Sequence, residues 1–140
     1  MSAESGVRIT SIQPEGWKPA RGYSNGILVS GAGRLLFVAG QIAWDEAQRI
    51  VGEGDFAAQF ERALRNVVEV VRTAGGDPAH VVRLTIYVTD KARYLAAQKT
   101  VGEAYRSVMG RHYPAMALVE VKGLLEDGAL VEIEATAAIP

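Results

Sequence analysis

The chain has 140 residues, about half of them apolar, which suits one domain with its own hydrophobic core over residues 1–140. The net charge of −1 excludes bulk electrostatic attraction to nucleic acid or to an anionic membrane. The absence of cysteine excludes disulfides, thiolate nucleophiles and cysteine-ligated metals, and no apolar run reaches the ~18–20 residues that span a bilayer. Because MSAESGVRIT has neither the basic nor the apolar part of a signal peptide, we expect a soluble, cytoplasmic protein.

The first forty residues contain three strand-like segments. Residues 7–12 alternate weakly and predict a first strand, whereas the prolines and glycines of 13–22 predict a loop. Residues 23–30 continue as a second strand, and GAGR at 31–34 predicts a hairpin turn into a third strand at 35–40. That third strand is apolar on both alternating faces, so we expect it to be buried on both sides.

Two amphipathic helices are predicted in the rest of the chain. Residues 55–76 begin at a capping aspartate, carry one apolar stripe at helical spacing and end at a Gly-Gly pair. Residues 81–89 alternate as a strand, and a second helix is expected at about 91–109. Two strands, about 115–121 and 129–138, close the chain.

This order of elements predicts an α+β domain with two layers, in which a mixed sheet carries two helices on one face. Two helices can cover only one side of such a sheet. The third strand and the last two strands nevertheless place apolar residues on both faces. The second face therefore needs a cover, and another copy of the chain is the simplest one.

Three glutamates interrupt the apolar runs of the last two strands: Glu120, Glu132 and Glu134. A carboxylate inside a strand is costly to bury unless a partner satisfies it. If Val119, Val131 and Ile133 face the helices, alternation places all three acids on the second face, near a subunit interface where ligand clefts are common. The alternative is that the acids form structural ion pairs with Arg83, Lys122 or an arginine of a partner.

Five segments follow one another in an order that is more specific than any one of them. They are GYSNGILVSG, LLFVAGQIAWD, FERALRNVVEVVRTAGGDPAHVVRLTIYVTD, YPAMALVEVKGL and ALVEIEATAAIP. This ordered set resembles the Rid family (reactive intermediate deaminases, also called the YjgF-like family). The resemblance implies a chorismate-mutase-like α+β fold and a homotrimer with three clefts between subunits. It also implies hydrolysis of enamines and imines such as 2-aminoacrylate to a keto acid and ammonia, without a metal or a cofactor.

The resemblance implies a role for several residues of this chain. Tyr23 matches a tyrosine that lines the family's pocket, and Glu132 matches the glutamate that positions the attacking water. Gly40 and Gln41 match the Gly-Gln pair of the third strand. These matches make Glu132 and Tyr23 the candidate catalytic residues.

Three positions depart from the family's pattern. Met116 stands where the family has the arginine that holds the substrate carboxylate, Ala39 stands in place of a serine, and Gly102 in place of an asparagine. A thioether cannot replace a bidentate guanidinium contact, whose loss costs on the order of 2–5 kcal/mol for a buried anion. Either the ligand is not a small amino-acid-derived enamine, or the anchor comes from elsewhere.

The candidates for another anchor are Arg21, two residues before Tyr23, and Arg111 or His112 before the fifth strand; a solvated loop is the alternative for Arg21. Trp44 either lines the cleft or packs at an interface, where tryptophan is common. His80 and His112 have no second ligand at metal spacing, so we expect no metal site.

The leading hypothesis is an enamine/imine deaminase-like hydrolase with an altered substrate preference. Glu132 would position water, helped by Tyr23 and by backbone donors near Gly40. The predicted substrate-binding residues are Gly40, Gln41, Met116, Ala39, Trp44, Glu120 and Arg21. The alternative is a non-catalytic, small-molecule-binding trimer, favoured by the loss of polar groups at three positions. RNA cleavage, an older label of the family, is disfavoured by the net charge and by the lack of a basic strand studded with aromatic residues.

Overall fold

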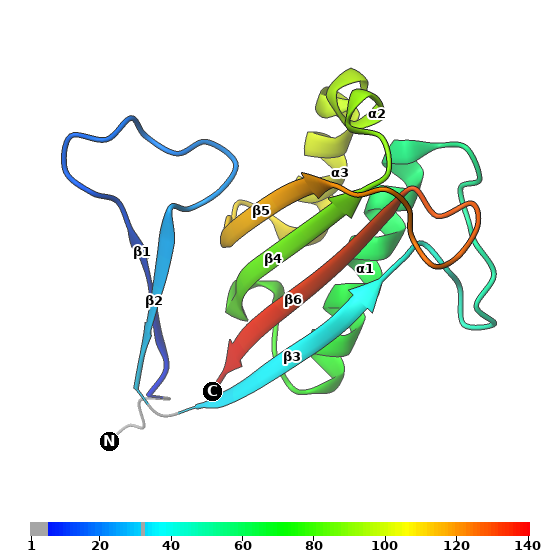
Figure 1. The fold of residues 1–140 in the computed structure, drawn as a ribbon. Coiled ribbons are helices and arrows are strands. Elements are labelled where there is room, and N and C mark those ends of the chain that lie inside the picture. The colour runs from blue at the N-terminus through cyan, green and yellow to red at the C-terminus, as the bar shows by residue number, and fades with distance from the viewer. Residues whose placement is uncertain (1–5, 32) are drawn as a thin grey trace.

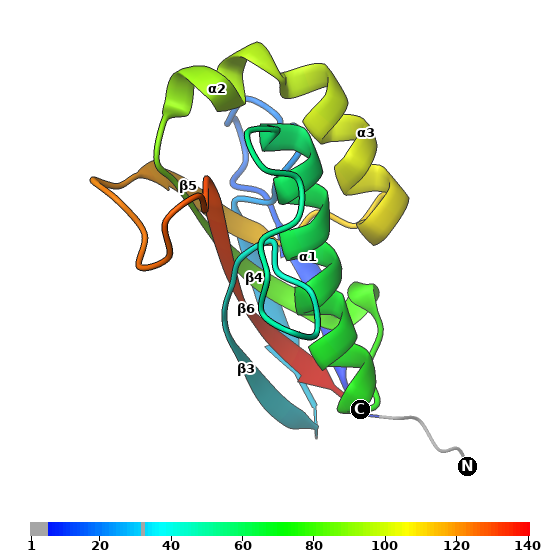
Figure 2. The ribbon, with the colours of Figure 1, turned by 90° about the vertical axis from the view of Figure 1, so that its right-hand side faces the viewer.

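The computed structural model describes residues 6–31 and 33–140. The elements run in the order β1 (Arg8–Ile12), β2 (Gly26–Ser30), β3 (Arg34–Gln41), α1 (Phe56–Thr73), the 3-10 turn η1 (Pro78–His80), β4 (Val81–Val88), α2 (Lys91–Ala96), α3 (Gln98–Met109), β5 (Ala115–Glu120) and β6 (Val131–Ile139). Four strands form a mixed sheet in the order β3-β6-β4-β5, in which β4 and β5 are parallel and the other pairs antiparallel (Figure 1). The helices lie together on one face of this sheet (Figure 2), so the predicted two-layer α+β architecture is confirmed.

Helix α1 begins after its predicted capping residue and buries its predicted apolar stripe. Asp55 accepts a hydrogen bond from the backbone N–H of Ala58 at 3.1 Å, which satisfies one of the free donors of the first turn. Phe60, Leu64 and Val67 follow at helical spacing and are buried in the core against the sheet. Among the described residues, no helix has the length and apolar character needed to cross a membrane.

The second predicted helix is interrupted. Ala97 ends α2 and precedes α3, so residues 91–109 form two helices instead of one. The buried stripe of α3 is the one that its spacing predicts, with Val101, Ala104 and Val108 turned inward. Nothing in the local sequence explains the break at Ala97.

The third strand is predicted to be buried on both sides, and within a single copy of the chain this prediction is wrong. In β3, Val38 is buried, whereas Leu35 is 63% and Phe37 is 73% exposed. Among the residues that the structure describes, no helix covers that side of the sheet, because α1, α2 and α3 pack on the opposite side (Figure 2). The structure therefore leaves an apolar strand surface uncovered.

The predicted orientation of the fifth strand is also wrong. Ile86 of β4 stands opposite both Ile133 and Leu118, so Leu118 points to the helix side together with Ile133. Val119 points to the open side instead. Glu120 consequently points away from the side of Glu132 and Glu134, and its Oε2 accepts a hydrogen bond at 3.0 Å from the N–H of Lys91 at the start of α2.

The physical reason lies in the sequence of β5. Alternation fixes which residues share a face, but both sets of alternate residues in AMALVE are largely apolar. The sequence of β5 therefore does not indicate which set of residues faces the core. Pairing with β4 determines the orientation of β5, since Met116 stands opposite Leu84, which is buried in the core.

The predicted hairpin between the second and third strands does not form. Strand β2 pairs with β1 in a separate two-stranded sheet, with Thr10 opposite Leu28. We call residues 8–30 the N-terminal arm. It stands beside the four-stranded sheet on the side of β5, away from β3 (Figure 1). Ala32, inside the predicted turn, lies outside the described residues.

Long-range contacts hold the arm in this place. The N–H of Ser24 donates to Pro114 O at 3.1 Å, and its hydroxyl donates to Tyr113 O at 2.6 Å. Ser24 also forms a parallel bridge with Ala115 at the beginning of β5. These contacts join residues about ninety positions apart, and no local turn signal anticipates them.

Candidate functional site

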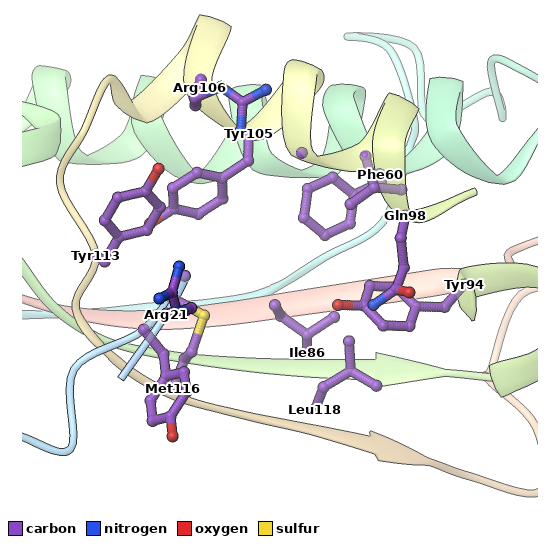
Figure 3. Close-up of a pocket in the computed structure, with 14 residues that line it drawn as sticks. Arg21, Phe60, Ile86, Tyr94, Gln98, Tyr105, Arg106, Tyr113, Met116 and Leu118 are labelled. Carbon is purple, nitrogen blue, oxygen red and sulfur yellow. The ribbon is translucent and has the colours of Figure 1, made fainter. Parts of the chain in front are cut away.

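A cavity of about 500 Å³ lies where the arm, the helices α2 and α3 and strand β5 meet (Figure 3). It is lined by Arg21, Gly22, Tyr23, Phe60, Ile86, Tyr94, Gln98, Val101, Gly102, Tyr105, Arg106, Tyr113, Met116 and Leu118. Its size falls within the ~300–1,000 Å³ typical of small-molecule sites.

Four residues that the sequence singled out come together in this cavity. Tyr23 and Arg21 enter from the loop of the arm, which the neighbouring Ser24 fixes to β5. Met116 enters from β5 and Gly102 from α3. The structure thus brings together Tyr23, Gly102 and Met116, which the family resemblance matched one by one, and Arg21, a candidate anchor for a carboxylate.

Aromatic side chains form much of the wall. Four of the chain's five tyrosines line the cavity. The rings of Tyr105 and Tyr113 stack with their centroids 5.3 Å apart and their planes 6° from parallel. The Tyr105 hydroxyl donates to His112 O at 2.6 Å, and burial raises the pKa of Tyr105, so this ring is a neutral and fixed part of the wall.

The charged residues of the lining are both arginines. Arg21 and Arg106 are exposed at the cavity, and no aspartate or glutamate lines it. Neither guanidinium forms a hydrogen bond or an ion pair with any residue in the part of the chain that the structure describes. Sequence reasoning missed Arg106. The signal was its position four residues after Gly102, which places both on one face of a helix.

The other proposed anchors lie elsewhere. Neither Arg111 nor His112 lines the cavity. The His112 Nε2 is 2.7 Å from Val81 O, so its ring is already engaged with the sheet.

Glu132 lies outside this cavity, on the open face of the sheet. It stands opposite Tyr87 in the β4–β6 register, whereas the cavity residue Met116 pairs with Leu84. The Glu132 carboxylate lies directly against Gly40, where a Cβ would overlap it. Within the described ranges this half-buried carboxylate has no hydrogen-bond or ion-pair partner.

A β-bulge shapes the strand beside Glu132. The register of β3 against β6 shifts between Val38 and Gln41, so Ala39 and Gly40 fall outside the regular pairs.

 The Gln41 side chain donates to Ala39 O at 3.1 Å, which ties the two sides of the bulge together. Ala39, Gly40, Gln41 and Glu132 therefore form a second group of candidate residues, separate from the cavity.

The remaining candidate residues do not join either group directly. Trp44 lines a different cavity beside α1, where Asn66 donates to its backbone carbonyl at 3.0 Å. Glu134 accepts a hydrogen bond from the Tyr87 hydroxyl at 3.0 Å, and this bond raises the pKa of Tyr87. The ion pairs considered for the three glutamates with Arg83 or Lys122 are not present among the described residues.

A metal site has no support from the side chains that the structure places. Within residues 6–31 and 33–140, no group of three or more histidine, aspartate or glutamate residues is arranged to hold an ion.

Comparisons with known proteins agree with this fold. A family model described as Endoribonuclease L-PSP matches residues 14–139. The chain is 36% identical over 115 residues to Protein DfrA of Myxococcus xanthus, covering 82% of this chain and 83% of the relative. It is 32% identical over 115 residues to the human 2-iminobutanoate/2-iminopropanoate deaminase, covering 82% and 78%. The crystal structure of YyfB from Yersinia pestis, a Rid protein of unknown function, superposes with a TM-score of 0.83 at 34% identity, covering 94% and 98%.

The two-layer fold and its cavity define an α+β protein of the kind found in Rid structures. The chain belongs to the YjgF/Rid family.

Proposed function

We propose that the protein is a hydrolase of imines and enamines that releases ammonia and a keto acid without a metal or a cofactor. The observation that carries the proposal is the pair of residue groups just described. Tyr23, Gly102 and Met116 share one cavity, and Glu132 lies against Gly40 on the opposite face of the sheet. Relatives named 2-iminobutanoate/2-iminopropanoate deaminase support the same chemistry at 32% identity.

The two groups of residues require a second copy of the chain. A single chain cannot bring Glu132 into the cavity, because the sheet lies between them. A neighbouring copy that packs its open face toward the cavity supplies Glu132 and Gly40 from outside. The exposed Leu35 and Phe37 on that face support such packing, and a homotrimer with three equivalent clefts is the assembly we propose.

The proposed hydrolysis needs one side chain that accepts a proton and returns it. An enamine first takes a proton on carbon and becomes the iminium ion. Water then adds to the iminium carbon while the Glu132 carboxylate accepts a proton from the water, which gives a neutral carbinolamine. Glu132 returns this proton to the nitrogen, the C–N bond breaks as the hydroxyl group loses its proton to solvent, and ammonia leaves a keto acid behind. Water and imine are thereby converted to one keto acid and one ammonia.

The test is ammonia release from imino acids generated in situ. We expect the wild-type protein to accelerate release, and Glu132→Gln to reduce the rate by roughly 100-fold, the usual weight of a positioned acid–base group. Glu126→Gln is the matched control, because Glu126 is exposed in the loop after β5, outside the cavity and away from Gly40, and is expected to leave the rate unchanged. Equal rates for the wild type and Glu132→Gln would contradict the assigned role.

A second candidate function is binding without catalysis. Met116, Ala39 and Gly102 supply no polar side chain at three positions where the family resemblance implies one. A folded trimer that binds imino or keto acids but accelerates no ammonia release would favour this function.

A further inference from the structure

The cavity combines two unpaired cations with an aromatic wall. Arg21 comes from the arm and Arg106 from α3, and both side chains line the same space (Figure 3). The lining contains no carboxylate that neutralises them. Beside them, the stacked rings of Tyr105 and Tyr113 present a flat and rigid apolar surface.

We infer that this cavity binds a carboxylate with an aromatic or large apolar body. This inference rests on the proposed function, and it names the substrates as imines of large apolar amino acids. The guanidinium group of Arg106 holds the carboxylate, since a planar guanidinium matches a carboxylate in a bidentate pair, and Arg21, on the other side of the stacked tyrosines, adds positive charge to the cavity (Figure 3). The body of the ligand lies against the stacked tyrosines.

Size and surface support a large ligand over a small one. A cavity of about 500 Å³ leaves most of its volume empty around a three-carbon imino acid. Met116, Leu118 and Ile86 add an apolar floor from the sheet. A thioether in this position packs against varied apolar shapes and offers nothing to a carboxylate. The carboxylate therefore pairs with a guanidinium, and Met116 contacts the apolar body of the ligand.

The binding test uses stable ligands, so that it does not depend on turnover. Calorimetry would compare 3-phenylpropanoate, its neutral analogue 3-phenylpropanamide, and propanoate. We expect 3-phenylpropanoate to bind about tenfold or more tightly than either of the others, because only it has both the anion and the ring. Arg106→Gln should weaken 3-phenylpropanoate by about tenfold and leave the amide unchanged. Arg111→Gln is the matched control, an exposed arginine outside the cavity.

Each outcome decides something. Equal binding of the acid and the amide, or no binding of either, overturns the inference. Tight binding of 3-phenylpropanoate without turnover of any imine leaves the ligand class in place and removes the proposed activity. Fast turnover of small imines, with no binding of the aromatic acid, removes the ligand class and keeps the activity.

A separate observation concerns two strand edges. Among the described strands, β3 pairs only with β6 and β2 only with β1, so each has one free edge. Both edges carry exposed apolar side chains, with Leu28 at 56% and Leu35 at 63% exposure. Unpaired edges of this kind attract another strand. The arm is held by Ser24 at the β5 side, whereas β3 is the opposite edge of the sheet.

We propose that the arm of one copy pairs through β2 with the free edge of β3 in a second copy. Ser30 ends β2 and Arg34 begins β3, and an antiparallel register that sets these two opposite each other also sets Val29 opposite Leu35. Continued past the end of β2, the same direction brings the Tyr23 end of the arm toward the bulge at Gly40 of the other copy. The second copy's Glu132, next to its Gly40, then lies at the cavity that Tyr23 enters. The exchange therefore completes the site. Repeated head to tail, it closes into a ring.

The absence of native cysteine permits a direct test by cross-linking. In the double variant Val29→Cys/Leu35→Cys, mild oxidation should give covalent oligomers on a non-reducing denaturing gel, because opposed residues meet the distance that a disulfide needs. Ile9→Cys/Leu35→Cys is the matched control. Ile9 pairs with Val29 from the far side of β2, one strand too distant to cross-link.

Two results would overturn the exchange. Monomers with an internal disulfide would show that the arm closes on its own β3. Free thiols in a folded oligomer would show that β2 and β3 do not pair in this register at all. Covalent oligomers from the control variant as well would show random contact between arms and equally contradict the proposal.

Discussion

Met116 and Glu132 lie on opposite faces of one sheet. Met116 pairs with the buried Leu84, and Glu132 pairs with Tyr87, whose side chain points to the other side of β4. The two positions that the family resemblance links most closely to substrate and water are therefore separated by the backbone of their own chain. In the proposed hydrolase, a working site therefore takes one of these two residues from each of two copies.

Mixed assemblies of two inactive variants should recover activity. Gly102→Phe fills the cavity from α3, and Glu132→Gln removes the proton acceptor. In trimers reassembled from an equal mixture, about one quarter of the clefts combine an intact cavity with an intact Glu132 from a neighbour. Ammonia release should thus rise to about one quarter of the wild-type rate. Two separately prepared variants that stay inactive after verified subunit exchange would show that each site lies within one chain.

Gly40→Ala should damage activity more than stability. The added methyl group overlaps the Glu132 carboxylate, which must move out of its place. Because the displaced atoms are the end of a flexible, half-buried side chain, we expect little change in the free energy of unfolding together with reduced ammonia release. Chemical denaturation and the turnover assay measure the two effects. Gly123→Ala is the control, since a Cβ there meets nothing within 4 Å. Unchanged activity in Gly40→Ala would show that the carboxylate position does not matter.

The sequence predicted those parts of the fold that local patterns determine. The stripe and cap of α1 and the alternation of β4 reappear as expected, because each segment has one clearly apolar face. The orientation of β5 failed, since both of its faces are apolar. The hairpin failed because the Ser24 contact with Tyr113, which holds the arm, joins residues 89 positions apart.

The candidate site shows the same division. Residues in quoted motifs, such as Tyr23 and Met116, were found and do share a cavity. Arg106 was missed, because a lone arginine on a helix has the same pattern as a solvated surface residue. Only the position of α3 across the cavity from β5 and the arm shows that Arg106 borders it.

Stability should fall at high pH because of Tyr105. Burial raises its pKa above the ordinary value of 10.0, so the neutral phenol is favoured in the folded state. Its contribution to stability is fully present below the unfolded pKa of about 10 and is lost as the pH rises through the folded pKa. Denaturation midpoints should therefore decline above about pH 10. Tyr105→Phe should flatten that part of the decline while lowering stability at neutral pH by about 1 kcal/mol, through the lost hydrogen bond to His112 O. The same decline in wild type and variant would assign it to other groups.

Met116→Arg should shift the preferred substrate toward small imino acids. At this position the wild-type cavity offers a small carboxylate only a thioether, so a small ligand seated at Met116 loses water without gaining an ion pair there. An arginine there supplies a bidentate partner deep in the cavity and occupies space that a large apolar body would otherwise fill. We expect kcat/KM for 2-aminoacrylate, generated in situ, to rise by about tenfold or more, and that for an aromatic imino acid to fall. Met116→Gln is the control, since it has a similar length and no charge. Wild-type turnover of 2-aminoacrylate that Met116→Arg does not improve would show that Arg21 and Arg106 already serve as the anchor for small substrates.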